Sequence, residues 1–360
     1  MTCDFFNDIF QQTYYNCLMA EFVSSFITGF QELVAQDLPE RLAGLKILNL
    51  FDGLVHYKFD GDSRQLEKII YFNNTFFVLR TAKGKGLNFA SMVGSLCSGK
   101  NYFLINKGSF RVRFQNENQF AKVDKNLSRR AEEYISRNSK LTVERLSPSC
   151  EIWFSIRREG FAFCGQLISK REFTEKNLNK GELRPEVAYL MCRFADLKED
   201  QVVLEPFCGY GAIPLQIKKH FKFKKLFVSD IDGEKVKGLA LRLAQGPHAA
   251  QGGQIDLRQA DVFELSHIQD NSIDAIVTDP PWGLWENIPD IEDFYNRMFV
   301  SFKRVLKPDG KMTILTARTA EFEKVVQNAG LKITDSLHTL VNGKKASLYV
   351  IASEAWQSSK

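Results

Sequence analysis

Three features that would place the chain outside the cytoplasm are missing from its sequence. No stretch approaches the ~18 consecutive apolar residues of a membrane-spanning helix. The first ten residues, MTCDFFNDIF, carry two acids and no basic residue, so they do not resemble a secretory signal. The seven cysteines are odd in number and scattered, with no CxxC pair, which argues against a disulfide framework or a zinc site. We therefore expect a reducing, cytoplasmic setting.

The net charge of +5 is small, but the charge is unevenly distributed along the chain. Residues 1–80 hold 6 basic and 10 acidic side chains, whereas residues 81–180 hold 19 basic and 9 acidic ones. Residues 181–360 are nearly balanced, with 23 and 24. A concentration of positive charge in the middle of the chain indicates a polyanionic partner, of which nucleic acid is the commonest, or a basic face that only meets solvent.

The first 80 residues predict a small α+β domain. In residues 20–38 the spacing of Phe22, Phe26, Phe30 and Leu33 fits one face of a helix. Three short segments that are typical of strands follow, with the sequences LKILNLF, LVHYKF and TFFVLR.

A second domain is predicted over residues 81–168. It contains a basic helix, DKNLSRRAEEYISRN, and ends in two strands, EIWFSIRREG and FAFCGQLI. In the first of these strands Ile152, Phe154 and Ile156 alternate with less apolar positions, which is the period of two of a strand. Residues 169–184 are polar and poor in aromatic residues, so we interpret them as a linker.

From residue 185 onward the pattern alternates between strands and helices. Pro185 suits the first turn of a helix, and apolar strands such as QVVLEPF and IDAIVT then alternate with amphipathic helices. The last two strands are joined by Asn342-Gly343, a strong hairpin signal. Residues 185–360 are therefore expected to form a doubly wound parallel sheet with helices on both faces and an antiparallel strand near its end.

Ligands of such sheets bind beyond the carboxyl ends of the strands. The first strand ends in LEPFCGYGA, where Gly209 and Gly211 permit a tight turn and the helix that follows offers its N-terminus. A glycine turn of this kind is weak evidence on its own, because such turns also serve structure alone. Position 214 is proline, where a dinucleotide fingerprint would have glycine or alanine, which argues against a nicotinamide oxidoreductase.

Carboxylates follow the next strands. Asp230 lies 21 positions after Gly209, near the ~20-residue offset at which an acid binds ribose hydroxyls. Asp261 follows the third strand, where it could accept a hydrogen bond from the amine of an adenine or cap a helix. The fourth strand ends in Asp279-Pro280-Pro281-Trp282-Gly283. Four consecutive strands that end in a carboxylate or a glycine turn predict one polar pocket.

This pocket is suited to S-adenosylmethionine, whose methyl group is already electrophilic. An aromatic amine is a poor nucleophile, so it must be held in line with the methyl group. We expect Asp279 to accept one of its two hydrogens. The carbonyl of Pro280 is expected to accept the other, because the restricted φ angles of the two prolines hold that carbonyl in place. The Trp282 ring could stack on a flipped base.

The motifs VLEPFCGYGAIPLQ, SDID and IDAIVTDPPWG resemble those of class I methyltransferases that modify amino groups. GELRPEVAYLMCRFADL resembles the putative RNA methylase group, whose members make N2-methylguanosine and carry an N-terminal ferredoxin-like segment and a THUMP domain. Residues 110–168 resemble the THUMP core. The tail HTLVNGKKASLYVIA is more similar to the tRNA-directed members than to the ribosomal ones.

The resemblance implies a ferredoxin-like segment over residues 1–80, a THUMP-like RNA-binding domain over 81–168, a linker over 169–184 and a methyltransferase domain over 185–360. It implies that one group of residues contacts the cofactor: Glu205, Gly209, Gly211, Asp230 and Asp261. It implies that a second group contacts the target base: Asp279, Pro280 and Trp282. Two positions depart from the pattern, since relatives often have aspartate where Glu205 stands and a small residue where Tyr210 stands.

The resulting hypothesis is a tRNA guanine-N2 methyltransferase that uses S-adenosylmethionine. Ribosomal guanosine, adenine N6 and a role in RNA binding without catalysis are the alternatives. Phosphate contacts are expected from the most basic clusters of the middle segment: Arg129, Arg130, Arg157 and Arg158. We expect the protein to be a monomer that binds RNA and to require neither a membrane nor a metal ion.

Overall fold

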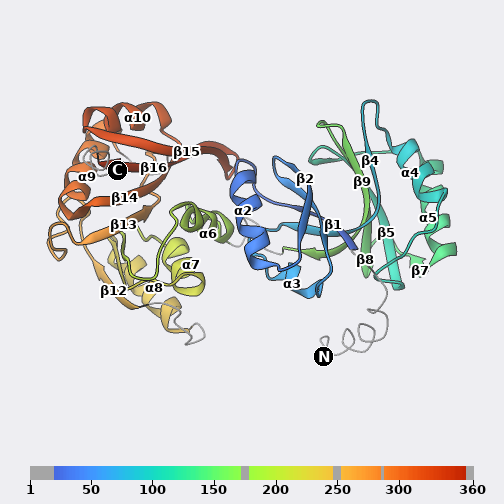
Figure 1. The fold of residues 1–360 in the computed structure, drawn as a ribbon, viewed down its shortest axis with the longest axis horizontal. Coiled ribbons are helices and arrows are strands. Elements are labelled where there is room, and N and C mark those ends of the chain that lie inside the picture. The colour runs from blue at the N-terminus through green and yellow to red at the C-terminus, as the bar shows by residue number, and fades with distance from the viewer. Residues whose placement is uncertain (1–19, 172–177, 246–252, 285–287, 354–360) are drawn as a thin grey trace. The chain divides into compact units, whose positions relative to one another are not determined.

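The computed structural model describes residues 20–171, 178–245, 253–284 and 288–353 (Figure 1). These residues form two compact units. The N-terminal unit comprises residues 20–26 and 34–171 of the described chain, and the C-terminal unit comprises residues 27–33 together with the described residues from 178 onward. The first 19 residues of the expected ferredoxin-like segment, and part of the expected linker, lie outside the described residues.

In the described part of the N-terminal unit the strands form one nine-stranded sheet, of order β2-β3-β1-β4-β9-β8-β5-β6, with β7 paired to β5. The strands are β1 (Ala20–Ser25), β2 (Lys46–Phe51), β3 (Leu54–Phe59), β4 (Asn74–Lys83), β5 (Lys107–Asn116), β6 (Gln119–Phe120), β7 (Lys140–Val143), β8 (Cys150–Arg157) and β9 (Phe161–Lys170). The helices are α2 (Gln31–Arg41), α3 (Arg64–Glu67), α4 (Phe89–Cys97) and α5 (Lys125–Asn138). The expected boundary after residue 80 falls inside β4, so the division into two domains stays a proposal.

The expected helix over residues 20–38 is wrong in its first part. Residues 20–25 form β1, which pairs with β3 and β4 on its two sides, and the helix begins only at Gln31. Because Phe22, Val23 and Ser24 are all buried, β1 lacks the alternation that marks a half-exposed strand. Between strand and helix, Gly29 has a φ of +90°, which ends any continuous helix there.

The other expected elements of this unit are present. The basic helix is α5, and its Ala131 and Ile135 are buried while Leu127 is partly buried, as the spacing predicts. Asp124 caps its N-terminus by accepting hydrogen bonds from the amides of Asn126 and Leu127. The alternation expected for β8 does not hold, because Trp153 and Ser155 are as buried as Ile152 and Phe154.

The C-terminal unit has the expected doubly wound sheet. In its described residues seven strands run in the order β12-β11-β10-β13-β14-β16-β15, parallel from β12 to β14, with β16 antiparallel to both of its neighbours. The strands are β10 (Val202–Glu205), β11 (Lys225–Asp230), β12 (Gln254–Gln259), β13 (Ile273–Thr278), β14 (Leu306–Thr316), β15 (Leu331–Val341) and β16 (Lys344–Ser353). The helices are α6 (Pro185–Phe194), α7 (Ala212–His220), α8 (Gly233–Gln245), α9 (Ile291–Val305) and α10 (Thr319–Asn328).

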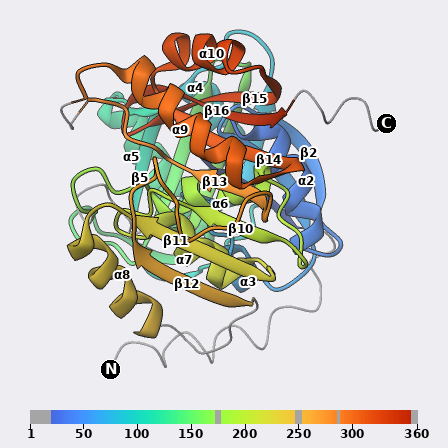
Figure 2. The same ribbon diagram turned by 90° about the vertical axis from the view of Figure 1, so that its left-hand side faces the viewer.

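Helices cover both faces of this sheet, with α9 and α10 on one side and α6 and α7 on the other (Figures 1 and 2). On the first side Leu204, Ile276 and Met312 of the strands pack with the aromatic residues of α9 and α10 in one buried cluster. Pro185 occupies the first turn of α6, and Asn342 and Gly343 both have positive φ in the hairpin between β15 and β16, as the sequence predicts.

The core of the C-terminal unit depends on the buried face of α9. Phe302 is fully buried in the cluster, whereas Val300 of the same helix is 72% exposed. We expect Phe302→Ala to lower the free energy of unfolding by about 3–5 kcal/mol, because it leaves a cavity that the neighbours fill only partly. Val300→Ala is the matched control and should change it little. Thermal unfolding of both variants by calorimetry measures the difference, and equal midpoints would contradict this packing.

Candidate functional site

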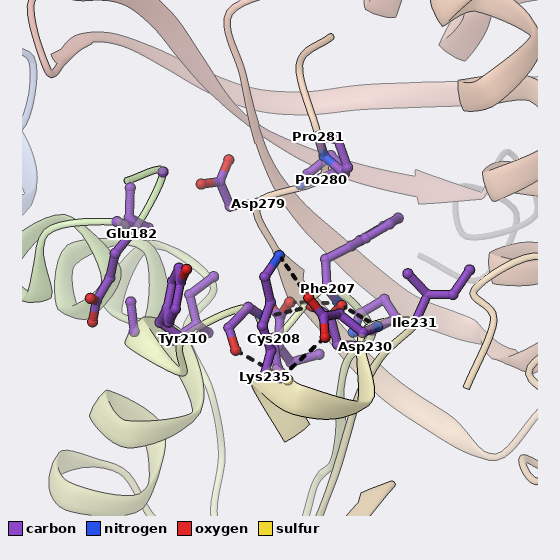
Figure 3. Close-up of a pocket in the computed structure, with 18 of the residues that line it drawn as sticks. Glu182, Phe207, Cys208, Tyr210, Asp230, Ile231, Lys235, Asp279, Pro280 and Pro281 are labelled. Atoms are coloured by element: carbon purple, nitrogen blue, oxygen red, sulfur yellow. Dashed lines mark hydrogen bonds and ion pairs between the residues drawn. The ribbon is translucent and has the colours of Figure 1, made fainter. Parts of the chain in front are cut away.

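A cavity of about 420 Å³ opens at the carboxyl ends of β10, β11 and β13 in the C-terminal unit. This is where the strand order reverses, since β10 is followed by β11 on one side and β13 lies on the other. Most of the residues that the sequence predicts for the cofactor and the target base line it: Glu205, Gly209, Asp230, Asp261, Asp279, Pro280 and Trp282. Figure 3 shows Asp279 across the cavity from Asp230, with Glu182 and Tyr210 to one side.

The glycine turn after β10 forms the floor of the cavity. Gly209 and Gly211 have φ values of +49° and +95°, a region that other residues rarely adopt. Gly211 is the N-cap of α7, and a Cβ there would lie 2.3 Å from Cδ1 of Leu239. A Cβ on Gly209 would have no neighbour closer than 3.9 Å, so this glycine leaves open space at the floor.

Asp230 ties the end of β11 to this turn. Its Oδ2 accepts a hydrogen bond from the Gly209 amide at 2.8 Å, and its Oδ1 accepts one from the Asp232 amide at 3.0 Å. Each carboxylate oxygen has two lone pairs, so both can accept a further hydrogen bond from a ligand. The neighbouring Ile231 is 67% exposed and lines the same cavity, which gives a polar group and an apolar surface side by side.

Glu205, at the end of β10, is fully buried. Its Oε1 accepts hydrogen bonds from the Phe207 amide at 3.0 Å and from Oγ1 of Thr278 at 2.9 Å, whereas its Oε2 has no hydrogen-bond partner among the described residues. Burial raises the pKa of Glu205 well above its usual range, and the nearby carboxylates of Asp279 and Asp230 add to the rise. Burial therefore favours the protonated form of the Glu205 carboxyl, and a bound cation would favour the ionised form.

Asp261 does not cap a helix, because residues 261–264 form a turn. Its Oδ1 accepts a hydrogen bond from the Phe263 amide at 2.8 Å, and this turn places the Phe263 ring in the cavity wall. The guanidinium of Arg297 lies 3.9 Å from the centre of that ring, and Phe294 packs against it edge-on. Sequence reasoning missed Phe263 and Arg297, since nothing in the local sequence signals a contact between a turn and α9.

Asp279 and Trp282 contact each other directly. The indole Nε1 of Trp282 donates a hydrogen bond to Oδ1 of Asp279 at 3.0 Å. Trp282 is only 5% exposed, so little of its ring is available for a base to stack on. The structure thus brings the two residues together but does not favour the stacking role that the sequence suggests for Trp282.

The segment before α6, expected to be a linker, contributes to the cavity wall through Glu182 and Leu183. Glu182 is 7% exposed and accepts a hydrogen bond from Arg242 of α8 at 2.9 Å. Arg242 also donates to the carbonyl of Tyr210 in the glycine turn. The segment is therefore held beside the turn. The available signal was the sequence Glu182-Leu183-Arg184 directly before Pro185, which starts α6.

Comparison with known proteins agrees with this geometry. A family model described as UPF0020, RMKL-like methyltransferase domain, matches residues 171–345. A Methanothermococcus thermolithotrophicus sequence named "Probable tRNA (guanine(10)-N2)-dimethyltransferase" is 31% identical over 136 residues, which are 37% of this chain and 80% of that one. The chain belongs to the RMKL-like methyltransferase family.

Two relatives with named activities are longer than the segments of them that match this chain. The tRNA (guanine(6)-N2)-methyltransferase of Thermus thermophilus is 28% identical over 61% of this chain and 65% of its own length. The tRNA (guanine(6)-N2)-methyltransferase of Archaeoglobus fulgidus is 27% identical over 42% of this chain and 44% of its own. The chain thus covers about half to two thirds of the length of these two relatives.

Solved structures establish the fold of this family member. TrmN from Thermus thermophilus superposes with a TM-score of 0.74 at 19% identity and covers 93% of this chain and 99% of its own. SMU.472, whose crystal structure is a complex with SAH, has a TM-score of 0.66 at 14% identity over 93% of this chain and 98% of its own. The C-terminal unit accordingly has the Rossmann-like fold of class I methyltransferases, as expected from the sequence.

The four arginines expected to bind RNA lie in the N-terminal unit of this methyltransferase-family chain. Arg129 and Arg130 are exposed on α5, although Arg129 lies 3.8 Å from Glu133, and Arg158 is also exposed. Arg157 is 9% exposed, and its Nη2 donates hydrogen bonds to the Asp52 carbonyl at 2.8 Å and to Glu159 at 3.2 Å. These internal contacts argue against a phosphate contact by Arg157.

None of the helices in the described residues is both long and apolar enough to cross a membrane. Among the same residues no group of three or more histidine, cysteine, aspartate and glutamate side chains could hold a metal ion.

The raised pKa of Glu205 predicts a pH dependence of stability. Above the pKa of an unfolded glutamate, about 4.3, the folded chain keeps this proton while the unfolded chain releases it. The wild type should therefore lose stability relative to Glu205→Gln as the pH rises from about 4.3 toward the raised pKa of the folded chain, by at most about 1.4 kcal/mol per pH unit. Urea unfolding across this range measures the difference.

The exposed Glu199→Gln is the control for this pH series, since its carboxyl is 72% exposed. It should follow the wild type at every pH. Parallel stability curves for the wild type and Glu205→Gln would show that the Glu205 carboxyl is ionised in the folded chain.

Proposed function

We propose that the chain is an S-adenosylmethionine-dependent RNA methyltransferase that methylates the exocyclic N2 amine of a guanosine in tRNA. The observation that carries this proposal is the meeting of the glycine turn, Asp230, Asp261 and Asp279 in one cavity. The named activities of the Thermus thermophilus and Archaeoglobus fulgidus relatives support the choice of guanine N2 and of tRNA.

The residues present fit this cofactor. The cavity is within the 300–1,000 Å³ range, roughly, of small-molecule sites. Asp230 would hold the ribose hydroxyls and Asp261 the adenine amine, while Ile231 and Phe263 supply apolar surface for the ring. At the floor, the space beside Gly209 and the N-terminus of α7 suit the carboxylate of the methionine part.

The charges around the cavity also suit a cationic ligand. Its wall carries the side chains of six acids and two lysines: Glu182, Glu205, Asp230, Asp232, Asp261, Asp279, Lys180 and Lys235. When bound, the cofactor supplies a methyl group on a positively charged sulfur. Positive charge near Glu205 would lower the pKa of its carboxyl. It would also interact favourably with Oε2, the oxygen that has no hydrogen-bond partner among the described residues.

The reaction requires the target amine to be held in line with the methyl group. Asp279 would accept one hydrogen of the amine and the Pro280 carbonyl the other. With its hydrogens held in this way, the amine nitrogen would direct its lone pair at the methyl group that the bound cofactor supplies on sulfur. The proton that the nitrogen loses would leave through the Asp279 carboxylate to solvent. Asp279 thus has the central catalytic role.

We propose that the N-terminal unit binds RNA as a ferredoxin-like part and a THUMP-like part. The +10 balance of residues 81–180 and the exposed Arg129, Arg130 and Arg158 support this role. A cytoplasmic, reducing setting is part of the proposal, supported by the five described cysteines, which are all free thiols.

Methylation of tRNA in vitro tests the function. Purified chain, unmodified tRNA and S-adenosylmethionine should yield N2-methylguanosine, detected by nucleoside mass spectrometry after digestion. Asp279→Ala should lose most turnover while its affinity for S-adenosylhomocysteine, measured by calorimetry, changes little. N6-methyladenosine without N2-methylguanosine would move the target to adenine, and modification of 23S rRNA alone would move it to the ribosome. Failure of the folded wild type to bind S-adenosylhomocysteine would leave only RNA binding without catalysis.

The salt dependence of tRNA binding tests the RNA-binding surface. Each phosphate contact contributes a slope of about −0.7 to −0.9 in a plot of log affinity against log salt. Replacing Arg129 and Arg130 by alanine should therefore weaken binding and flatten the slope by roughly one to two units. Affinity for S-adenosylhomocysteine should not change.

The matched control removes two exposed lysines before β11, Lys222 and Lys224, at the amino ends of the strands and thus away from the cavity. This double variant should keep the wild-type slope. An unchanged slope in the folded arginine variant would instead assign the phosphate contacts to other basic residues, first to Lys170, Arg171 and Lys180.

A further inference from the structure

The contact between Trp282 and Asp279 has a directional component that stacking does not need. The indole N–H points at one carboxylate oxygen, Oδ1, at 3.0 Å. An aspartate carboxylate otherwise rotates about a broad, roughly two-fold torsion, so one fixed donor selects one orientation. Phenylalanine or tyrosine at position 282 would supply a ring but no N–H at this place.

The indole that supplies this N–H is itself held firmly. Trp282 is 5% exposed, and its carbonyl accepts a hydrogen bond from Nε of Arg318 at 2.9 Å. Arg318 follows β14, and its amide donates to Oγ1 of Thr316, which is hydrogen-bonded to the buried hydroxyl of Tyr295 on α9. The loop that carries Trp282 is therefore tied by hydrogen bonds to the end of β14 and, through Thr316, to α9.

We propose that Trp282 is a positioning residue for Asp279, holding the carboxylate in the orientation that accepts a hydrogen of the target amine. The inference rests on the proposed function, because only an amine substrate needs this acceptor. It assigns to Trp282 a role other than stacking on the base. An alignment role of this kind acts on the rate of methyl transfer and not on the affinity for RNA or cofactor.

Trp282→Phe separates the two roles, because it keeps an aromatic ring and removes the N–H. Its single-turnover rate, at saturating tRNA and S-adenosylmethionine, should fall by about tenfold or more, since small misalignments in an active site have effects of this size. Its dissociation constants for tRNA and for S-adenosylhomocysteine should stay within about twofold of the wild type.

Trp153→Phe is the matched control. Trp153 is also 5% exposed, and its Nε1 also donates to a carboxylate, Oε2 of Glu151 at 2.6 Å, in the N-terminal unit. This variant removes the same kind of hydrogen bond from a buried indole that does not line the cavity. Its rate should equal that of the wild type.

A double-mutant cycle shows whether Trp282 acts through Asp279. Asp279→Ala removes the acceptor, so the further change Trp282→Phe should then have no effect on the residual rate. Independent roles would instead multiply the two losses, and such a result would overturn the proposal.

A spectroscopic measurement tests the contact without reference to activity. The chain has four tryptophans, and the indole N–H signal of Trp282 in a ¹⁵N–¹H spectrum is the one absent from Trp282→Phe. We expect Asp279→Ala to shift this signal and to speed its exchange with solvent, because the hydrogen bond is lost. A signal that stays in place would overturn the proposal.

The outcomes distinguish the inference from the function on which it rests. An active wild type with an equally fast Trp282→Phe overturns the inference alone. A loss of tRNA affinity at an unchanged rate also overturns it, in favour of stacking. A folded wild type that binds S-adenosylhomocysteine but methylates no exocyclic amine of RNA overturns the proposed function, and the inference with it.

Discussion

The hydrogen bond between the Gly209 amide and the Asp230 carboxylate is the contact on which the site depends. It joins the turn after β10 to the end of β11 at 2.8 Å, and a backbone bond from the Cys208 amide to the Ser229 carbonyl at 2.9 Å lies beside it. Together they set the width of the gap between two neighbouring strand ends. The positive φ angles at Gly209 and Gly211 allow the chain to turn there without strain.

The electrostatics of the cavity follow from the same crowding of strand ends. Parallel strands place their C-terminal residues at one edge of the sheet, so acids that are far apart in the sequence meet there. Glu205 is the most buried of them, and its high pKa is the consequence of burial among other carboxylates. A site of this kind is more stable with a positively charged ligand than without one.

The sequence predicted the strand ends well because each is marked locally, by an apolar run that stops at an acid or a glycine. It could not place Phe263 against Arg297 or Glu182 against Arg242, because these pairs join elements that are distant in the chain. The mistaken helix at residues 20–25 and the burial of Arg157 have one cause. Residues 20–25 and Arg157 both lie on strands that are buried on both faces. In such strands buried and exposed residues do not alternate, so the spacing of the apolar residues does not distinguish a strand from a helix or show which side chains are exposed.

The position of β16 determines when the sheet can be completed during synthesis. This strand, from the last part of the sequence, lies between β14 and β15, so β14 lacks its neighbour on that side until residues 344–353 have left the ribosome. The hairpin that brings β16 back also carries Val341 and Asn342, which line the cavity. Co-translational folding of the central parallel strands therefore leaves the cofactor pocket open along one wall until the hairpin docks.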